Sequence, residues 1–331
     1  MSRPARSSSP AWRRPSVWAG LAVLAVAVVM SFLLGRRDRA PALPEFDAAR
    51  AYSLVTQQTD FGPRIPGTAA HDSMRVWLVE RLGLHADRVI EQRITVPDPR
   101  DTSRVFSGAN VIASWRPEAT ERVLLAAHWD TRPVADNDPD PSRRIEPVLG
   151  ANDGGSGVAV LLEIARLLDA EPLARRVGVD VVLFDLEDLG TIDPDVPSDR
   201  RVPFAMGSEM FVRDNPGYRP AWGVLLDMVG DRNLRIPKEG YSAEYAPEVV
   251  ERVWASARRV GAAAFLDEAG PAIHDDHVPF LREGIPVVNL IQTPFPDTWH
   301  TTRDTPENVS AESLGQVGRV LVDLLWGAEP G

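Results

Sequence analysis

Residues 123–130 read Val-Leu-Leu-Ala-Ala-His-Trp-Asp, an apolar run of strand length that ends in a histidine and an aspartate. Similar apolar runs lie at residues 179–184, 223–228 and 287–291. Segments with apolar residues at helical spacing lie near residues 158–168, 247–260 and 314–325. Strands that alternate with helices predict an α/β fold in which helices cover both faces of the sheet.

Side chains that can bind metal stand at the ends of these runs and in one glycine-rich turn. They are His128, Asp130, Asp153, Glu187, Asp188, Asp227 and His300. Because neighbouring strands of one sheet end close together, these side chains can converge on one or two cations. The chain has no cysteine, and imidazole and carboxylate ligands without thiolate suit a catalytic zinc ion. Taken singly, each residue could instead be a helix cap, a turn residue or a buried hydrogen-bonded histidine.

Three other histidines, His71, His85 and His274, do not stand at the end of a predicted strand. A histidine that forms an ordinary hydrogen bond is the commoner case. We therefore interpret these three as structural.

The amino-terminal part of the chain contains a long apolar segment. Residues 17–34 form a run of about 18 residues, long enough to span a bilayer as a helix, and arginines flank it on both sides. This pattern predicts a basic cytoplasmic tail (1–16), a transmembrane signal anchor (17–34), a linker (35–50) and a catalytic domain (51–331). The protein would be a single-pass membrane protein, held in the lipid bilayer by residues 17–34, with its catalytic domain in the periplasm or outside the cell. A cleaved signal peptide is the alternative.

The charge of the chain indicates the kind of partner. The formal net charge is -11, although residues 1–40 carry seven arginines and one aspartate, so the rest of the chain is more acidic still. Such a field repels nucleic acid, which we do not expect as a partner, and it attracts cationic ligands such as peptide amino termini. Lysine occurs once, at Lys238, among many arginines. This usage suggests a GC-rich bacterial genome.

The order of the motifs resembles that of the zinc aminopeptidase superfamily. The motifs are His-x-Asp, Gly-Ala-Asn-Asp-Gly, an acidic pair, Leu-Leu-Asp, Asp-His-x-Pro-Phe and His-Thr, at residues 128–130, 150–154, 187–188, 225–227, 276–280 and 300–301. Three stretches look more like the glutaminyl-peptide cyclotransferases, the cyclising branch of that superfamily. They are Phe-Gly-Pro-Arg-Ile-Pro-Gly at 61–67, Asp-Asp-His-Val-Pro-Phe-Leu-Arg at 275–282, and Pro-Phe-Pro-Asp-Thr-Trp-His-Thr at 294–301. Asp275 and Trp299 are the residues that ordinary aminopeptidases of the superfamily lack.

The resemblance implies a fold and a set of roles. The fold is a three-layer sandwich with a mixed, largely parallel central sheet flanked by helices, here preceded by the predicted transmembrane helix. One zinc ion would be held by Asp153, Asp188 and His300. Glu187 would be the general acid/base, with Asp227 and Asp275 as a hydrogen-bonded acid pair beside it. His128 and Asp227 would be ligands or former ligands of a second metal, and Asp130 would be the carboxylate that orients His128. Trp299 and Phe295 would form walls of the substrate pocket.

This chain departs from the animal cyclases at two points. Those enzymes have Glu-Glu where this chain has Glu187 and Asp188, so the second acid is one methylene shorter here. The tryptophan that follows their acidic pair has no counterpart in residues 189–201.

The implied activity is the conversion of an amino-terminal glutamine of a peptide or protein into pyroglutamate, with release of ammonia. The alternative on the same scaffold is a zinc aminopeptidase, in which Glu187 activates a water between two zinc ions and the first peptide bond is hydrolysed. A third reading, from another class, is a catalytically silent membrane-tethered binding domain. The intact general base and ligands argue against it.

Overall fold

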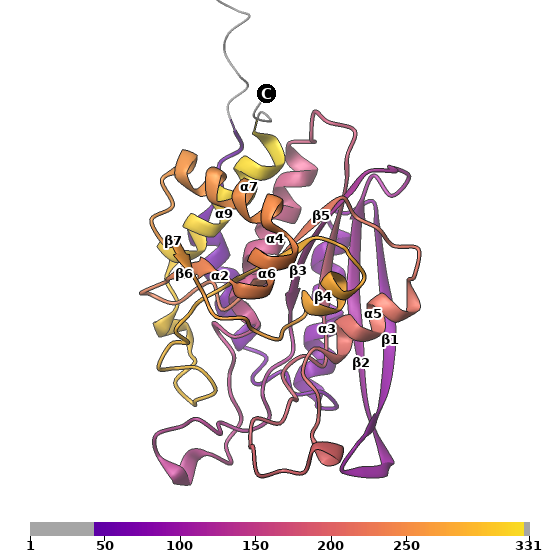
Figure 1. The fold of residues 1–331 in the computed structure, drawn as a ribbon, viewed down its shortest axis with the longest axis vertical. Coiled ribbons are helices and arrows are strands. Elements are labelled where there is room, and N and C mark those ends of the chain that lie inside the picture. The colour runs from indigo at the N-terminus through magenta and orange to yellow at the C-terminus, as the bar shows by residue number, and fades with distance from the viewer. Residues whose placement is uncertain (1–42, 328–331) are drawn as a thin grey trace, which may run out of the picture. The chain divides into compact units, whose positions relative to one another are not determined.

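The computed structural model describes residues 43–327, and residues from Pro44 onward form one compact unit. A six-stranded sheet lies at its centre, with strand order β1-β2-β4-β3-β5-β8 (Figure 1). Its strands are β1 (Arg88–Asp98), β2 (Asp101–Trp115), β3 (Arg122–His128), β4 (Gly178–Phe184), β5 (Trp222–Asp227) and β8 (Val287–Ile291). Strands β4, β3, β5 and β8 are parallel to one another, while β2 runs antiparallel to both β4 and β1. The prediction of a mixed, largely parallel sheet is therefore confirmed.

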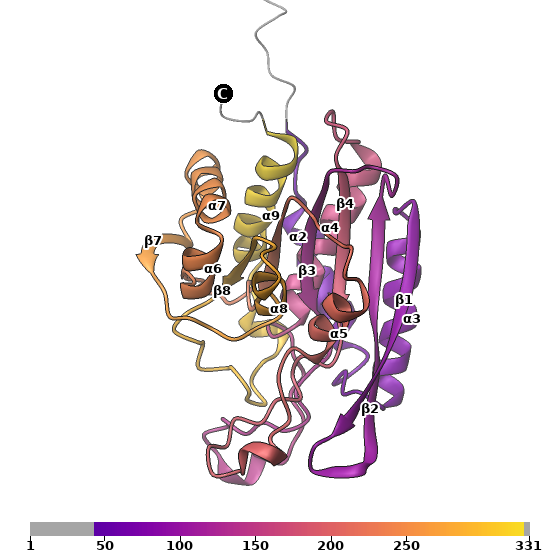
Figure 2. The same cartoon turned by 45° about the vertical axis from the view of Figure 1, so that its right-hand side comes forward.

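Helices cover both faces of the sheet (Figure 2). The larger apolar core packs the sheet against α2 (Ala48–Thr59), α3 (Ala69–Gly83), α4 (Gly155–Ala170), α7 (Pro247–Val260) and α9 (Ala311–Trp326). A second core on the opposite face packs it against α5 (Met206–Asp214) and α8 (Val278–Arg282). The remaining elements are α6 (Gly240–Tyr245), the parallel pair β6 (Ile236–Lys238) and β7 (Phe265–Ala269), and the 3-10 helices η1 (Pro141–Arg143), η2 (Ser198–Arg200) and η3 (Pro306–Asn308). Because both faces are covered, the parallel strands β4, β5 and β8 are buried along their whole length, which explains their unbroken apolar runs.

At its amino-terminal side, the compact unit begins before residue 51, the predicted start of the catalytic domain. Helix α2 begins at Ala48, and the buried Phe46 packs against Gly318 of α9, so the ordered domain takes in the last residues of the predicted linker 35–50. Among residues 43–327, no helix is both long enough and apolar enough to cross a bilayer. The anchor predicted at residues 17–34 lies outside the described residues and stays a prediction.

Candidate metal centre and active site

Two clusters of predicted ligands meet at the carboxyl ends of the parallel strands. His128 ends β3, Asp227 ends β5, Asp188 follows β4, His300 follows β8, and Asp153 lies in the turn before α4. One cluster is His128, Asp153 and Asp227, and the other is Asp153, Asp188 and His300; within each, the ligand atoms lie within 4.8 Å of one another. All five side chains are buried. The structure thus brings together the residues that the sequence nominated for both metal positions.

Asp153 stands between the two clusters. Its Oδ1 lies 3.0 Å from Nε2 of His128, and its Oδ2 lies 3.7 Å from Nε2 of His300. The first cluster is completed by Asp227, whose Oδ1 lies 3.2 Å from Nε2 of His128. The second is completed by Asp188, whose Oδ1 lies 3.3 Å from Nε2 of His300. A carboxylate with one oxygen in each cluster can serve one cation or bridge two.

The second cluster fits a zinc ion by its donor set. It offers one imidazole nitrogen and carboxylate oxygens, with no sulfur. Within the described part of the chain, Oδ2 of Asp188 is buried without any hydrogen-bond partner. A buried carboxylate oxygen left unpaired is costly, and a bound cation removes that cost.

The turn that presents Asp153 is held by Asp304. The backbone N–H groups of Asn152 and Asp153 donate to the two carboxylate oxygens of Asp304, at 2.8 and 3.0 Å. Burial, reinforced by the charge of Asp153, raises the pKa of Asp304 to about 7. Gly154 adopts a positive φ of 77°, and a Cβ there would lie 2.9 Å from the carbonyl oxygen of Asp130. Only glycine therefore fits this turn without displacing its neighbours.

Asp130 joins the ends of β3 and β4. Its two carboxylate oxygens accept the backbone N–H groups of Glu187 and Asp188, each at 3.1 Å. Oδ1 also lies 3.7 Å from Nδ1 of His128, on the side of the ring away from the ligand atom. This is the position of the orienting carboxylate that the resemblance implies.

Three non-glycine residues at the site have positive φ. They are Leu186 (60°), Met228 (49°) and His300 (54°), which precede Glu187, follow Asp227 and form a ligand, respectively. Such conformations cost on the order of 1–3 kcal/mol each and persist where surrounding structure imposes them. These strained conformations lower the stability of the fold and orient the side chains of the site.

Glu187 lies beside the two clusters and belongs to neither. Its side chain is only 8% exposed. Burial raises the pKa of Glu187 well above its usual range, while the charge of His128 opposes this and the carboxylates of Asp188 and Asp275 reinforce it. A carboxyl group with a raised pKa can both accept and return a proton near neutral pH.

A cavity of about 240 Å³ opens over Glu187 and the ligands. Its apolar and aromatic lining comprises Ile192, Phe204, Met228, Ala272, Ile273, Ile291, Phe295 and Trp299. The rings of Phe295 and Trp299 lie 4.3 Å apart between centroids, and Trp299 lies 4.0 Å from the ring of His300. The two aromatic residues predicted as pocket walls therefore do line the cavity, directly beside a ligand.

The predicted hydrogen bond between the carboxyl groups of Asp227 and Asp275 stays a prediction. Both residues line the cavity, but Asp275 accepts hydrogen bonds from the side chain of Asn289 and from the backbone N–H of Asp276. Asp227 instead faces His128. The pair interacts through charge, because burial and then the charge of Asp275 raise the pKa of Asp227 to about 7.

Two residues that the sequence did not nominate contact the second cluster. Arg132 donates through Nε and Nη2 to the carboxylate of Asp136, and through Nη1 to the backbone oxygen and Oδ1 of Asp188, at 3.2 and 3.3 Å. Oδ1 of Asp136 lies 3.4 Å from Nδ1 of His300. Burial lowers the pKa of His300, but Asp188 and Asp136 raise it to about 9. Arg132 and Asp136 thus hold two of the three predicted zinc ligands, Asp188 and His300, in position.

The stretch 61–67 acts through Arg64, which is fully buried. Its guanidinium donates to the backbone oxygens of Trp129, Leu149 and Gly150. Burial lowers the pKa of Arg64 to about 10. Arg64 therefore ties together the segment that follows His128 and the turn that presents Asp153.

The three histidines interpreted as structural have different surroundings. Nε2 of His71 lies 2.9 Å from Asp185, and the His71 ring stacks on Trp129 in the core. His85 pairs with Asp169 near the surface. His274 lines the catalytic cavity, and its interpretation as structural stays a prediction. It lies in an irregular segment before Asp275, where no periodicity indicates that it faces a cavity.

Phe204 lies just beyond residues 189–201, the stretch without a tryptophan, and lines the catalytic cavity. The loop can fold over this ring because residue 190 is glycine, where a Cβ would come within 2.1 Å of Phe204. Phe204 was not among the predicted residues of the pocket.

Comparisons with known proteins agree with this geometry. Residues 110–325 match peptidase family M28. The glutaminyl cyclase of Bacteroides thetaiotaomicron is 37% identical, with 87% of this chain and 100% of that chain covered and a TM-score of 0.81. A leucine aminopeptidase precursor from the same organism is also 37% identical, over 87% of this chain and 99% of that chain, with a TM-score of 0.80. The glutaminyl-peptide cyclotransferase of Bos taurus is 27% identical over 296 residues, which are 80% of this chain and 79% of that protein.

Proposed function

The chain belongs to peptidase family M28, and from this premise we propose that it is a zinc-dependent glutaminyl-peptide cyclotransferase that converts amino-terminal glutamine into pyroglutamate. The observation that carries the proposal is the catalytic cavity, in which Glu187, Asp275 and Trp299 lie together beside the ligand clusters. Relatives and solved neighbours named as glutaminyl cyclases support the same activity.

The reaction joins two groups of one residue. The α-amine nitrogen attacks the γ-amide carbon, the bond from that carbon to the amide nitrogen breaks, and ammonia leaves without consumption of water. A zinc ion held by Asp153, Asp188 and His300 would supply Lewis-acid polarisation of the γ-carbonyl oxygen.

Glu187 moves the proton. It accepts one from the attacking amine and returns one to the departing ammonia, a role that its raised pKa suits. Asp275 contributes to that raised pKa through its charge. Phe295 and Trp299 form an apolar wall, which limits the access of water that would otherwise compete with the amine.

We assign a single zinc ion to the cluster of Asp153, Asp188 and His300. In the other cluster, Nε2 of His128 already lies 3.0 Å from Oδ1 of Asp153 and 3.2 Å from Oδ1 of Asp227. By contrast, Oδ2 of Asp188, in the cluster of Asp153, Asp188 and His300, is buried without a hydrogen-bond partner among the described residues. Zinc analysis of the purified protein, with one equivalent expected per chain, tests the assignment.

A zinc aminopeptidase is the second candidate. The observation in its favour is that His128, Asp153 and Asp227 form a complete second cluster, with Asp153 shared. The deciding experiment offers the zinc-loaded protein a glutamine-initiated peptide and a leucine-initiated peptide, with the products followed by mass spectrometry. Loss of one ammonia from the first peptide supports the cyclase, whereas release of free leucine from the second supports the peptidase.

We further propose that residues 17–34 anchor the protein in a bacterial membrane, with the catalytic domain outside the cytoplasm. The apolar run and its flanking arginines support this. Full-length protein expressed in a bacterium should stay in the membrane fraction with its amino terminus intact. Soluble protein whose amino terminus begins after Arg39 would instead identify a cleaved signal peptide.

A further inference from the structure

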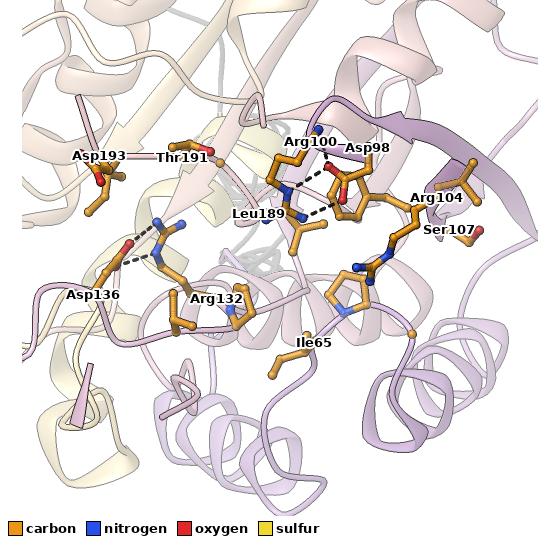
Figure 3. Close-up of a pocket in the computed structure, with 18 residues that line it drawn as sticks. Ile65, Asp98, Arg100, Arg104, Ser107, Arg132, Asp136, Leu189, Thr191 and Asp193 are labelled. Atoms are coloured by element: carbon orange, nitrogen blue, oxygen red, sulfur yellow. Dashed lines mark hydrogen bonds and ion pairs between the residues drawn. The ribbon is translucent and has the colours of Figure 1, made fainter. Parts of the chain in front are cut away.

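A cavity of about 780 Å³ adjoins the catalytic cavity and has no part in the mechanism above. Figure 3 shows its walls, which come from four separate segments. These segments are residues 65–67, the hairpin of β1 and β2 at 98–107, the loop 132–136 and the loop 189–193. The volume falls within the range of about 300–1,000 Å³ that is typical of ligand sites, whereas the catalytic cavity lies below it.

The two cavities are neighbours. Ile192 lines both of them. Arg132 and Asp136 line the larger cavity, and the same two side chains contact Asp188 and His300. The catalytic cavity is large enough for a glutamine residue but not for several residues of a peptide. A peptide whose first residue occupies it can therefore continue into the larger cavity.

Three arginines line the larger cavity, namely Arg100, Arg104 and Arg132. Arg132 is bound by Asp136, and Arg100 donates two hydrogen bonds to Asp98 (Figure 3). Among the described residues, the exposed Arg104 guanidinium forms no hydrogen bond or ion pair with a carboxylate, although Asp98 and Asp101 on the same hairpin lie within range of its charge. The N–H donors of Arg104 are therefore open to a further carboxylate.

The rest of the lining suits a peptide. Val105 and Val134 are 56% and 37% exposed, and Leu189 adds a third apolar side chain. The acid on the facing loop is Asp193, whose carboxylate already accepts the backbone N–H of Asp195. The hairpin wall therefore offers the positive charge, and the opposite wall offers the negative one.

We propose that this cavity binds the residues that follow the amino-terminal glutamine, and that Arg104 favours substrates with acidic side chains there. The inference rests on the proposed cyclase function. It adds a substrate class to that function, namely peptides with a glutamine followed within a few residues by aspartate or glutamate.

The test compares four substrates on the zinc-loaded protein. They are glutamine amide, which reaches only the catalytic cavity, and the amidated peptides Gln-Ala-Glu-Glu, Gln-Ala-Gln-Gln and Gln-Ala-Lys-Lys. The readout is kcat/KM for each peptide relative to that for glutamine amide. An exposed charge pair is worth up to about 1 kcal/mol, so we expect the acidic peptide to exceed the neutral one by about two- to five-fold, less at high salt.

Variants at the hairpin assign the effect. Arg104→Gln should abolish the preference for the acidic peptide, and Arg104→Glu should reverse it in favour of the lysine peptide. Arg93→Gln is the matched control, because Arg93 is an exposed arginine of β1 that pairs with Glu91 and does not line the cavity. Its preference should equal that of the unmodified protein.

The outcomes are distinguishable. If none of the substrates, glutamine amide included, yields a cyclised product, the proposed function is wrong and this inference falls with it. If all are cyclised but kcat/KM for the acidic peptide does not exceed that for the neutral one, the inference alone is overturned. It is also overturned if Arg104→Glu still prefers the acidic peptide to the lysine peptide.

Discussion

Replacing Glu187 by glutamine tests the division of labour between two adjacent acids. The substitution keeps the size and hydrogen-bonding shape of the side chain but removes its ability to carry a proton. The backbone should stay in place, because the N–H groups of residues 187 and 188 are both held by Asp130 at 3.1 Å. Glu187 belongs to neither ligand cluster, so the zinc content should be retained.

The size of the effect follows from the role. General acid/base assistance contributes about 10² to 10⁴ in rate, which corresponds to about 3 to 5 kcal/mol in the activation barrier. We expect Glu187→Gln to lose kcat by this factor in an ammonia-release assay. Zinc content and the midpoint of thermal unfolding should remain close to those of the unmodified protein.

Asp188→Asn is the matched variant. Oδ1 of Asp188 lies 3.3 Å from Nε2 of His300, and its Oδ2 has no hydrogen-bond partner within the described residues, so this carboxylate is placed as a ligand. The variant should lose zinc as well as activity. Near-normal turnover by Glu187→Gln, or loss of zinc as complete as that of Asp188→Asn, would refute the assignment.

Four further outcomes are expected. His300→Ala should lose most of its zinc and activity, because two protein ligands leave an inadequate coordination sphere, and full zinc occupancy would count against the site. His128→Ala should keep its zinc equivalent if the enzyme is a one-zinc cyclase, whereas loss of an equivalent would favour the aminopeptidase. Asp136→Asn should weaken zinc binding about ten- to a hundred-fold in a chelator competition, as loss of a carboxylate behind a ligand commonly does, and unchanged affinity would remove Asp136 from the site. Burial raises the pKa of Glu239, but its hydrogen bond with His277 lowers the pKa to about 2, below the ordinary 4.5. The resulting stabilisation of the fold, about 3 kcal/mol, is present above pH 4.5 and is lost as the pH falls towards 2. In an acid titration, the unfolding free energy of Glu239→Gln should therefore decline less between pH 4.5 and pH 2 than that of the unmodified protein.

The sheet strands that carry the ligands were predictable because of how they are buried. β4, β5 and β8 are covered on both faces, so each reads as a continuous apolar run that ends where the polar site begins. The antiparallel strands β1 and β2 were not predicted. Much of both strands is exposed, with polar and charged residues throughout, and their pairing with each other and with β4 supplies what the local sequence does not.

The supporting residues of the site were harder to predict than its ligands. Asp304 binds a backbone N–H 152 positions away, and Asp138 binds Thr302 across 164 positions. An aspartate in a loop has the same local signature whether it is solvated or holds such a contact. Asp136 was missed for this reason, since only the fold brings it to His300.

The shorter acid at position 188 shows how these supporting contacts matter. An aspartate reaches less far than the glutamate of the animal cyclases, yet its Oδ1 still lies 3.3 Å from Nε2 of His300. Arg132 contacts both the backbone oxygen and the side chain of Asp188, and it binds Asp136 behind the same histidine. One guanidinium therefore positions the short acid and, through Asp136, the imidazole that faces it. A ligand set read from the sequence gives the identity of the donors, while their spacing depends on this buried contact between loops.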